Sequence, residues 1–363
     1  MMVYPAWVST TLPLPTNDLS SGKPFTMDLN AVKAAAARTE GRLHLTPLLS
    51  SAGAADALRR SSGIVIGDGR VRLKSEHLQH TGSYKVRGML NRVVAFIDHF
   101  GIDEVKRRGI VTFSAGNAAA AYAWAGRSFG IPVRVVMPKS AVPAKIAACR
   151  AYGAEVHLVD GLMGEAGVLK DALIAEHGCI DAHPFDDPYV IAGHGTLGAE
   201  ILDQLPETDV VIGGLGGGGM LCGAAVALKG LKPSIRIYGV EPEGSSAVKQ
   251  AVDAGAIVPV TPKSVADGLG APYAGSWTLP LAASLLDGIV TLPDEEILGG
   301  LHFAMQRTKQ VVEPAGAAAF AALLFRRVPV ATGDRVVVIL SGGNVDLARI
   351  PEFLERATPI PGA

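Results

Sequence analysis

Several features that other protein classes need are scarce or missing in this chain. Three cysteines occur among 363 residues, and their odd number and wide spacing suit neither a disulfide framework nor a zinc site. A formal net charge of −1 lacks the basic excess of proteins that bind nucleic acid or membrane surfaces. No apolar run reaches the roughly 18 residues of a membrane span, and residues 1–26 do not resemble a signal peptide. We therefore expect a cytoplasmic protein with no nucleic-acid or membrane partner.

What the chain has in quantity is apolar sequence, organised as strands alternating with helices. Hydrophobic residues make up 48% of it and the mean hydropathy is +0.30, enough for a large core in one or two domains. One complete strand-helix-strand unit is predicted, with a strand at 133–137, a helix at 144–152 and a strand at 155–159. This alternation predicts an α/β fold with a mostly parallel sheet.

One lysine lies in a sequence that is more typical of a reactive residue in an enclosed site than of an exposed surface residue. Lys85 lies in the run Thr-Gly-Ser-Tyr-Lys-Val-Arg-Gly at 81–88, a glycine-flanked turn that can deliver an amine into an enclosed space. A desolvated lysine has a lowered pKa and can form a Schiff base with an aldehyde cofactor. Taken alone, the motif fits a surface lysine at a helix start equally well, so other elements must decide.

A glycine-rich turn follows a later apolar strand. Residues 209–220 read Asp-Val-Val-Ile-Gly-Gly-Leu-Gly-Gly-Gly-Gly-Met, and a helix-forming segment follows. Four glycines in a row exceed what a tight turn needs, and they let backbone N–H groups at a helix N-terminus surround one phosphate. A nicotinamide-binding fold is the rival, since Glu241 has the spacing of a ribose ligand. Lys85 argues against it, because a nicotinamide enzyme does not need a reactive lysine.

Two further strands run into polar turns where open α/β sheets bind ligands. The strand 335–340 ends in Ser341-Gly342-Gly343-Asn344. The strand from Val111 ends in Ser114-Ala115-Gly116-Asn117, and an alanine-rich helix begins near Ala118. Backbone N–H groups at that helix start suit a carboxylate.

Four features occur together: Lys85, the glycine-rich phosphate turn at 213–219, the turn at 114–117 that suits a carboxylate (the carboxylate turn), and the turn at 341–344 that begins with a serine (the serine turn). In this combination the chain resembles the pyridoxal-phosphate enzymes of fold type II, the tryptophan-synthase-β-like group. Within that group the chain resembles the serine/threonine dehydratase and serine racemase family. The resemblance runs from about Leu45 to Asp346 and includes TGSYK at 81–85, SAGN at 114–117, GGGGM at 216–220, ADGL at 266–269 and LSGGNVD at 340–346.

The resemblance implies a two-domain α/β fold, in which each domain is an open, mostly parallel, twisted sheet flanked by helices. We place a flexible N-terminal arm at 1–29, a large cofactor-binding domain at 30–106 and 187–355, a small mobile domain at 107–186 and a tail at 356–363. We also expect a homodimer or a higher homo-oligomer.

The same resemblance implies the residues of the site. Pyridoxal 5'-phosphate is expected to contact Lys85, Tyr84, Asn117, Gly216, Gly217, Gly218, Gly219, Met220 and Ser341. An amino-acid substrate is expected to contact Ser114, Ala115, Gly116, Asn117, Ala118 and Asp267. Lys85 and Ser341 are the expected catalytic residues, the first as general base and the second as a neutral partner of the pyridine nitrogen.

The implied reaction is β-elimination from a 3-hydroxy amino acid such as L-threonine or L-serine, giving a 2-oxo acid and ammonia. Threonine synthase is an alternative, although it and the cysteine synthases carry Lys-Asp-Arg where this chain has Lys85-Val86-Arg87. A dehydratase for hydroxyaspartate or 3-phenylserine is another. A non-catalytic vitamin-binding protein is the alternative from a different class.

Four positions depart from the family pattern. Ala118 stands where dehydratases often carry histidine, and Ala115 stands where serine racemases carry a second serine, which disfavours racemisation. His194 replaces a glutamine. Glu241 matches one carboxylate of the family's cation site, but the chain has Ser245, Ser246 and Ala247 where the second carboxylate is expected, so we assign no metal.

Overall fold

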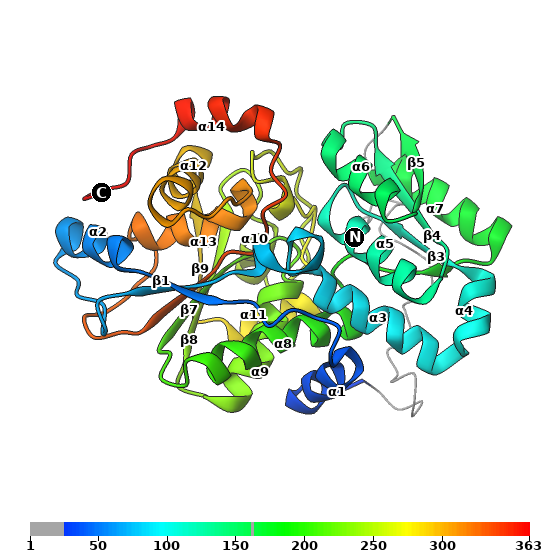
Figure 1. Ribbon diagram of the computed structural model, residues 1–363, viewed down its shortest axis with the longest axis horizontal. Coiled ribbons are helices and arrows are strands. Elements are labelled where there is room, and N and C mark those ends of the chain that lie inside the picture. Colours follow the sequence, from blue (N-terminus) through cyan, green and yellow to red (C-terminus); the bar gives the residue numbers. More distant parts are fainter. Residues whose placement is uncertain (1–24, 161–162) are drawn as a thin grey trace.

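Two sheets of different size organise the computed structural model, which describes residues 25–160 and 163–363 (Figure 1). The arm expected at 1–29 therefore lies almost wholly outside the described residues. The two sheets stand side by side, with the smaller one on the right in Figure 1. The predicted α/β class with mostly parallel sheets is confirmed.

The larger sheet has six described strands in the order β1-β2-β10-β7-β8-β9. Its strands are β1 (Leu48–Ser51), β2 (Val71–Lys74), β10 (Val336–Ile339), β7 (Val210–Gly214), β8 (Arg236–Pro242) and β9 (Gly288–Leu292). Only the pairing of β1 with β2 is antiparallel. The ends of β7 and β10, which precede the two predicted glycine turns, are neighbours in this sheet.

The smaller sheet is wholly parallel, with the described order β5-β4-β3-β6. Its strands are β3 (Ile110–Phe113), β4 (Val133–Pro138), β5 (Glu155–Val159) and β6 (Ile180–Asp181). The helices α5 (Asn117–Phe129), α6 (Pro143–Ala151) and α7 (Met163–His177) connect them. α6 is the helix expected at 144–152.

Helices bury both faces of the larger sheet, which explains why its central strands are apolar without interruption. Val210 and Ile212 of β7 pack with α12 (Asp294–Phe303) and α13 (Pro314–Leu324), whereas Val211 packs with α8 (Pro188–Gln204) and α9 (Gly219–Leu231). Successive strand residues point to opposite faces. The remaining helices are α1 (Leu29–Thr39), α2 (Ala52–Ser62), α3 (Lys85–Phe100), α4 (Ile102–Arg108), α10 (Ala247–Ala254), α11 (Thr278–Leu285) and α14 (Ile350–Arg356).

Close helix packing sets the position of α3, whose first residue is Lys85. A Cβ atom at Gly193 of α8 would lie 2.7 Å from the carbonyl oxygen of Arg87 on α3. A Cβ atom at Gly223 of α9 would lie 2.1 Å from the carbonyl oxygen of Ile191 on α8. Glycine is therefore required where these backbones meet, and the contacts fix α3 against the helices behind the site.

The predicted domain boundaries stay a prediction, and two of them fall inside helices of the structure. All four strands of the smaller sheet lie within 107–186, but α4 crosses the limit at 106/107 and α14 crosses the limit at 355/356. α1 begins at Leu29, the last residue of the expected arm. No helix among the described residues is long and apolar enough to cross a membrane.

Candidate active site

Lys85 lies at the start of α3, directly after a tight turn. Thr81 and Gly82 in this turn have φ of 60° and 73°, and the reversal brings the lysine beside the carboxyl end of β10, an interior strand of the larger sheet. Its Nζ donates a hydrogen bond to the carbonyl oxygen of Pro184 at 3.0 Å. Burial lowers the pKa of Lys85 to about 8, since a neutral carbonyl compensates an ammonium less than a carboxylate would.

The lysine turn is bonded directly to the serine turn after β10. Tyr84 N–H donates to the Ser341 carbonyl at 3.1 Å, and Gly343 N–H donates to the Gly82 carbonyl at 2.9 Å. Ser341 is buried, and its Oγ donates a long hydrogen bond to the Ala315 carbonyl at 3.5 Å. At that length the hydroxyl has little hydrogen bonding within the protein, so it remains suited to a ligand.

The glycine loop between β7 and α9 adjoins the lysine through Phe185. A Cβ atom on Gly217 would lie 2.3 Å from the Phe185 ring, and Phe185 follows the proline whose carbonyl accepts from Lys85. Gly218 has φ of 89°, a conformation that L side chains rarely adopt. Gly219 and Met220 begin α9, so the helix N-terminus faces the loop and suits a phosphate.

The carboxylate turn reaches the same place from the smaller sheet. Ser114 Oγ accepts from Gly116 N–H at 3.2 Å, and α5 begins at Asn117. The Asn117 side chain is held at both ends, because its Nδ2 donates to Glu313 Oε1 at 2.5 Å and its Oδ1 accepts from Asn344 Nδ2 at 2.9 Å. Of the other predicted substrate residues, Ala115 is exposed and Ala118 is buried.

Two charged residues of this site are absent from the predicted set. Glu313 is the N-cap of α13 and is buried, and burial raises the pKa of its carboxyl group. Lys145 of α6 lies 2.7 Å from Asp267 Oδ2 and 3.3 Å from Glu313 Oε2. The Glu-Pro motif at 313–314 was a signal for the first residue. For Lys145 the sequence offers only its place two residues after Pro143.

Buried polar atoms without partners border Lys85. His194 is fully buried with its ring centroid 4.8 Å from that of Tyr84, and neither of its ring nitrogens has a hydrogen-bond partner in the described residues. Burial, followed by the charges of Lys85 and Arg87, holds the pKa of His194 well below its usual value. Ser83 Oγ is buried and unpartnered in the same way. Such atoms are costly unless a ligand or water meets them, so these residues fit a polar cofactor beside the lysine.

Glu241 serves a local structural purpose. Its Oε1 and Oε2 accept from the backbone N–H groups of Val248 and Lys249 at 2.9 and 2.8 Å, so it closes the start of α10. Burial raises the pKa of Glu241 to about 7. The part of the chain that the structure describes has no group of three or more His, Cys, Asp or Glu side chains able to hold a metal.

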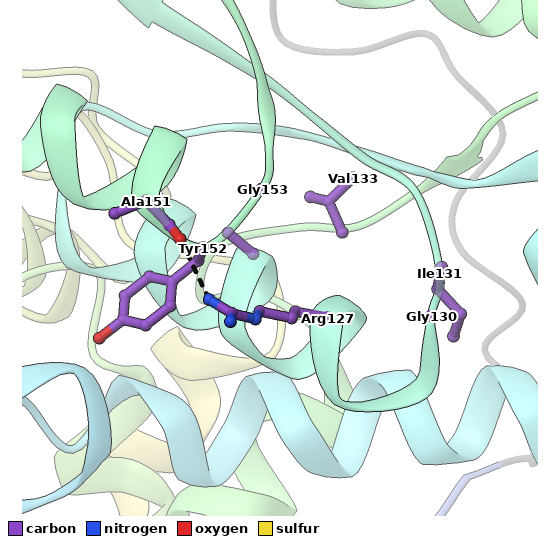
Figure 2. A pocket seen from close by; sticks show the side chains of 8 residues that line it. Arg127, Gly130, Ile131, Val133, Ala151, Tyr152 and Gly153 are labelled. Carbon is purple, nitrogen blue, oxygen red and sulfur yellow. Dashed lines mark hydrogen bonds between the residues drawn. The ribbon is translucent and has the colours of Figure 1, made fainter.

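A hollow of about 380 Å³ lies elsewhere, on the smaller sheet's side of the molecule (Figure 2). Its wall includes Arg127, Tyr152 and Gly153, and Arg127 donates to the Ala151 carbonyl at 3.1 Å. Arg127 is near the end of α5 opposite Asn117. The hollow is therefore separate from the site around Lys85.

Comparison with known proteins decides the family. The model of the family described as pyridoxal-phosphate dependent enzyme matches residues 46–342. The chain belongs to this family. Pyridoxal phosphate is its cofactor, it is a lyase, and the nicotinamide alternative is wrong.

Similar proteins share most of the chain. An L-threo-3-hydroxyaspartate ammonia-lyase of Pseudomonas sp is 38% identical over 328 residues, which cover 88% of this chain and 96% of that protein. An L-threonine ammonia-lyase of Geobacter sulfurreducens is 40% identical over 285 residues, which cover 78% of this chain and 69% of that protein. The solved structure of maize serine racemase has a TM-score of 0.83 and 31% identity, covering 92% of this chain and 98% of its own.

Proposed function

We propose that the protein catalyses β-elimination from a 3-hydroxy amino acid, releasing a 2-oxo acid and ammonia. One observation carries the proposal. Lys85, whose pKa burial lowers to about 8, adjoins the glycine loop through Pro184 and Phe185, and its turn is bonded to the Ser341 turn. This proximity supports the assignment of Lys85 as the base, the glycine loop as the phosphate site and Ser341 as the partner of the ring nitrogen, which the reaction requires together.

Each residue of the site has a distinct task in this proposal. Pyridoxal phosphate, when bound, withdraws electrons from the substrate's α-carbon. The loop 216–220 would bind its phosphate through backbone N–H groups, Tyr84 would pack beside its ring, and Asn117 would orient it. Lys85 holds the cofactor and then, as a free amine, takes the α-proton. Ser341 would offer the ring nitrogen a neutral hydroxyl instead of a carboxylate, which would limit electron withdrawal by the ring and so favour rapid loss of the β-hydroxyl.

The substrate's α-carboxylate is assigned to the turn at 114–118. The backbone N–H groups at the start of α5 point to this turn, and the positive end of the helix favours an anion. Asp267 borders the same space from the side of the larger sheet. Ala115 lacks the hydroxyl that a second acid on the opposite face would need, so elimination is proposed over racemisation.

The substrate within the class of 3-hydroxy amino acids is proposed separately from the reaction. Relatives named for threonine and for hydroxyaspartate are similarly distant from this chain. We propose L-threonine or L-serine as the type of substrate, with L-threo-3-hydroxyaspartate and 3-phenylserine as the alternatives. A screen that measures 2-oxo acid release from these four compounds ranks them directly.

The test of the activity is the variant Lys85→Ala. It should lose ammonia release and the absorbance band of lysine-bound cofactor while keeping its circular dichroism spectrum. Lys139→Ala is the matched control, since Lys139 is an exposed lysine paired with exposed Asp160 and should stay fully active. Appreciable ammonia release by Lys85→Ala would refute the proposal. Phosphate release from phosphohomoserine would instead support a threonine-synthase activity.

We propose a homodimer or higher homo-oligomer, to be tested by light scattering coupled to size-exclusion chromatography. We also propose a cytoplasmic location, to be tested by cell fractionation. The three cysteines are free and buried, as expected for a reducing compartment.

A further inference from the structure

Lys145 joins the two halves of the molecule across the site. It belongs to α6, which packs against the smaller sheet, and its side chain is only 6% exposed. Its Nζ lies 2.7 Å from Asp267 Oδ2 and 3.3 Å from Glu313 Oε2. Both carboxylates belong to the side of the larger sheet, since Glu313 caps α13 and Asp267 begins a short 3-10 turn packed on α13. One ammonium thus bridges two carboxylates that are far from it in sequence.

These contacts connect to both of the turns that line the site. Glu313 Oε1 accepts from Asn117 Nδ2, so the partner of Lys145 is also the partner of the predicted cofactor ligand. The stem of Lys145 lies against the carboxylate turn, with its Cδ 3.0 Å from where a Cβ of Gly116 would stand. Glu313 N–H donates to the Gly342 carbonyl in the serine turn at 3.1 Å. A movement of Lys145 away from Glu313 would therefore remove the ion pair that supports the direct bonds of Asn117 with Glu313 and Asn344, and so weaken the attachment of the carboxylate turn to the larger sheet.

The charges favour a bridge that persists at neutral pH. Burial by itself lowers the pKa of Lys145, but the carboxylates of Glu313 and Asp267 outweigh it, so that its pKa is raised overall. The ammonium is therefore retained. A charged hydrogen bond between partly buried groups is stronger than an exposed ion pair.

We propose that Lys145 is a positioning residue that latches the smaller sheet's domain onto the larger one and thereby holds Asn117 and its turn against Glu313 and the serine turn. Opening of the site requires Lys145 to leave Asp267 and Glu313. Closing restores both ion pairs. The latch is a property of this chain's own side chains and acts without substrate.

The first test is hydrogen exchange on the cofactor-loaded protein without substrate, comparing the wild type with Lys145→Met. Methionine keeps the length of the stem and removes the charge. Peptides that cover 110–130 should exchange about tenfold faster or more, because loss of a charged hydrogen bond shifts an opening equilibrium by roughly that factor. Lys139→Met is the control, since Lys139 pairs with Asp160 inside the same domain, and its exchange should match the wild type. Lys145→Arg, which keeps the charge, should recover much of the protection.

Two results would overturn the latch. Unchanged exchange over 110–130 in Lys145→Met would mean that the bridge does not hold the domains. Faster exchange spread evenly over the strands β7 and β10 as well would mean that Lys145 supports general stability. Because this experiment uses no substrate, its outcome does not depend on which reaction the protein catalyses.

A kinetic test rests on the proposed function and separates positioning from chemistry. A weaker latch lowers the fraction of closed enzyme, so Lys145→Met should raise KM for the best hydroxy amino acid about tenfold while kcat changes little. The charge exchange of Lys145→Glu with Asp267→Lys should bring the exchange rates back toward wild type more than either single change. A fall in kcat with unchanged KM would place Lys145 in the chemical step and contradict the latch.

Discussion

Lys85 should react with an aldehyde at a much lower pH than an ordinary lysine. Burial lowers its pKa from 10.5 to about 8, and each unit of pKa is a factor of ten between the charged and neutral amine. At pH 7 the neutral and therefore nucleophilic fraction is about one in ten for Lys85, roughly 300 times that of an exposed lysine. The amine is neutral above pH 8, so its reactivity should rise up to that pH and then level.

The assay follows binding of pyridoxal phosphate to cofactor-free protein by the absorbance band of the lysine adduct, between pH 6 and 10. The same mixture with Lys85→Ala gives the slow reaction of all other lysines, which is subtracted. We expect the corrected rate to rise about tenfold per pH unit at first and to become flat near pH 8. A rate that climbs without a break to pH 10 would show that Lys85 has an ordinary pKa and would refute the role given to burial.

The lowered pKa of Lys85 also predicts that its charged form lowers the free energy of unfolding. A lysine whose pKa is lowered on folding destabilises the folded protein at pH values below the folded pKa, by about 3 kcal/mol for 2.5 units. Lys85→Met should therefore raise the free energy of unfolding of the cofactor-free protein below pH 8. The advantage should fade between pH 8 and 10.5. Equal unfolding free energies at pH 7, measured with urea, would argue against a buried ammonium.

Three other outcomes follow from the geometry. Gly217→Val should weaken cofactor affinity, measured by fluorescence titration, because its Cβ would stand 2.3 Å from the Phe185 ring; unchanged affinity would remove the phosphate from this loop. Ser341→Asp should lower elimination relative to α-proton exchange by roughly one to two decades, since a carboxylate at the ring nitrogen stabilises the carbanion; an unaltered ratio with cofactor bound would mean that Ser341 does not face the ring. Arg87→Met should cost about 3–5 kcal/mol of unfolding free energy, because it leaves the buried Glu76 carboxylate without an ion pair and Glu200 with Lys74 alone. Arg72→Met nearer the surface should cost under about 1 kcal/mol; similar losses in urea unfolding would contradict the buried network.

The local sequence predicted the separate elements of the site, because each depends on short-range properties of neighbouring residues. An uninterrupted apolar strand predicts burial on both faces, four glycines predict a backbone turn at a helix start, and each was found where it was placed, at β7 and before α9. The lysine, the serine turn and the carboxylate turn were likewise recognisable, because their residue types and order are dictated by what each must bind. The family and cofactor followed from their combination.

Tertiary structure alone decided which side chains meet. Glu313 and Lys145 are 168 residues apart in the chain, and no local pattern relates them; folding places one at the cap of α13 and the other on α6, and only then do their charges pair. The lowered pKa of Lys85 has the same origin, since it depends on burial and on the Pro184 carbonyl. Sequence determines propensity and chemistry residue by residue, whereas ion pairs, burial and close helix contacts are long-range properties that exist only once the two sheets are packed together.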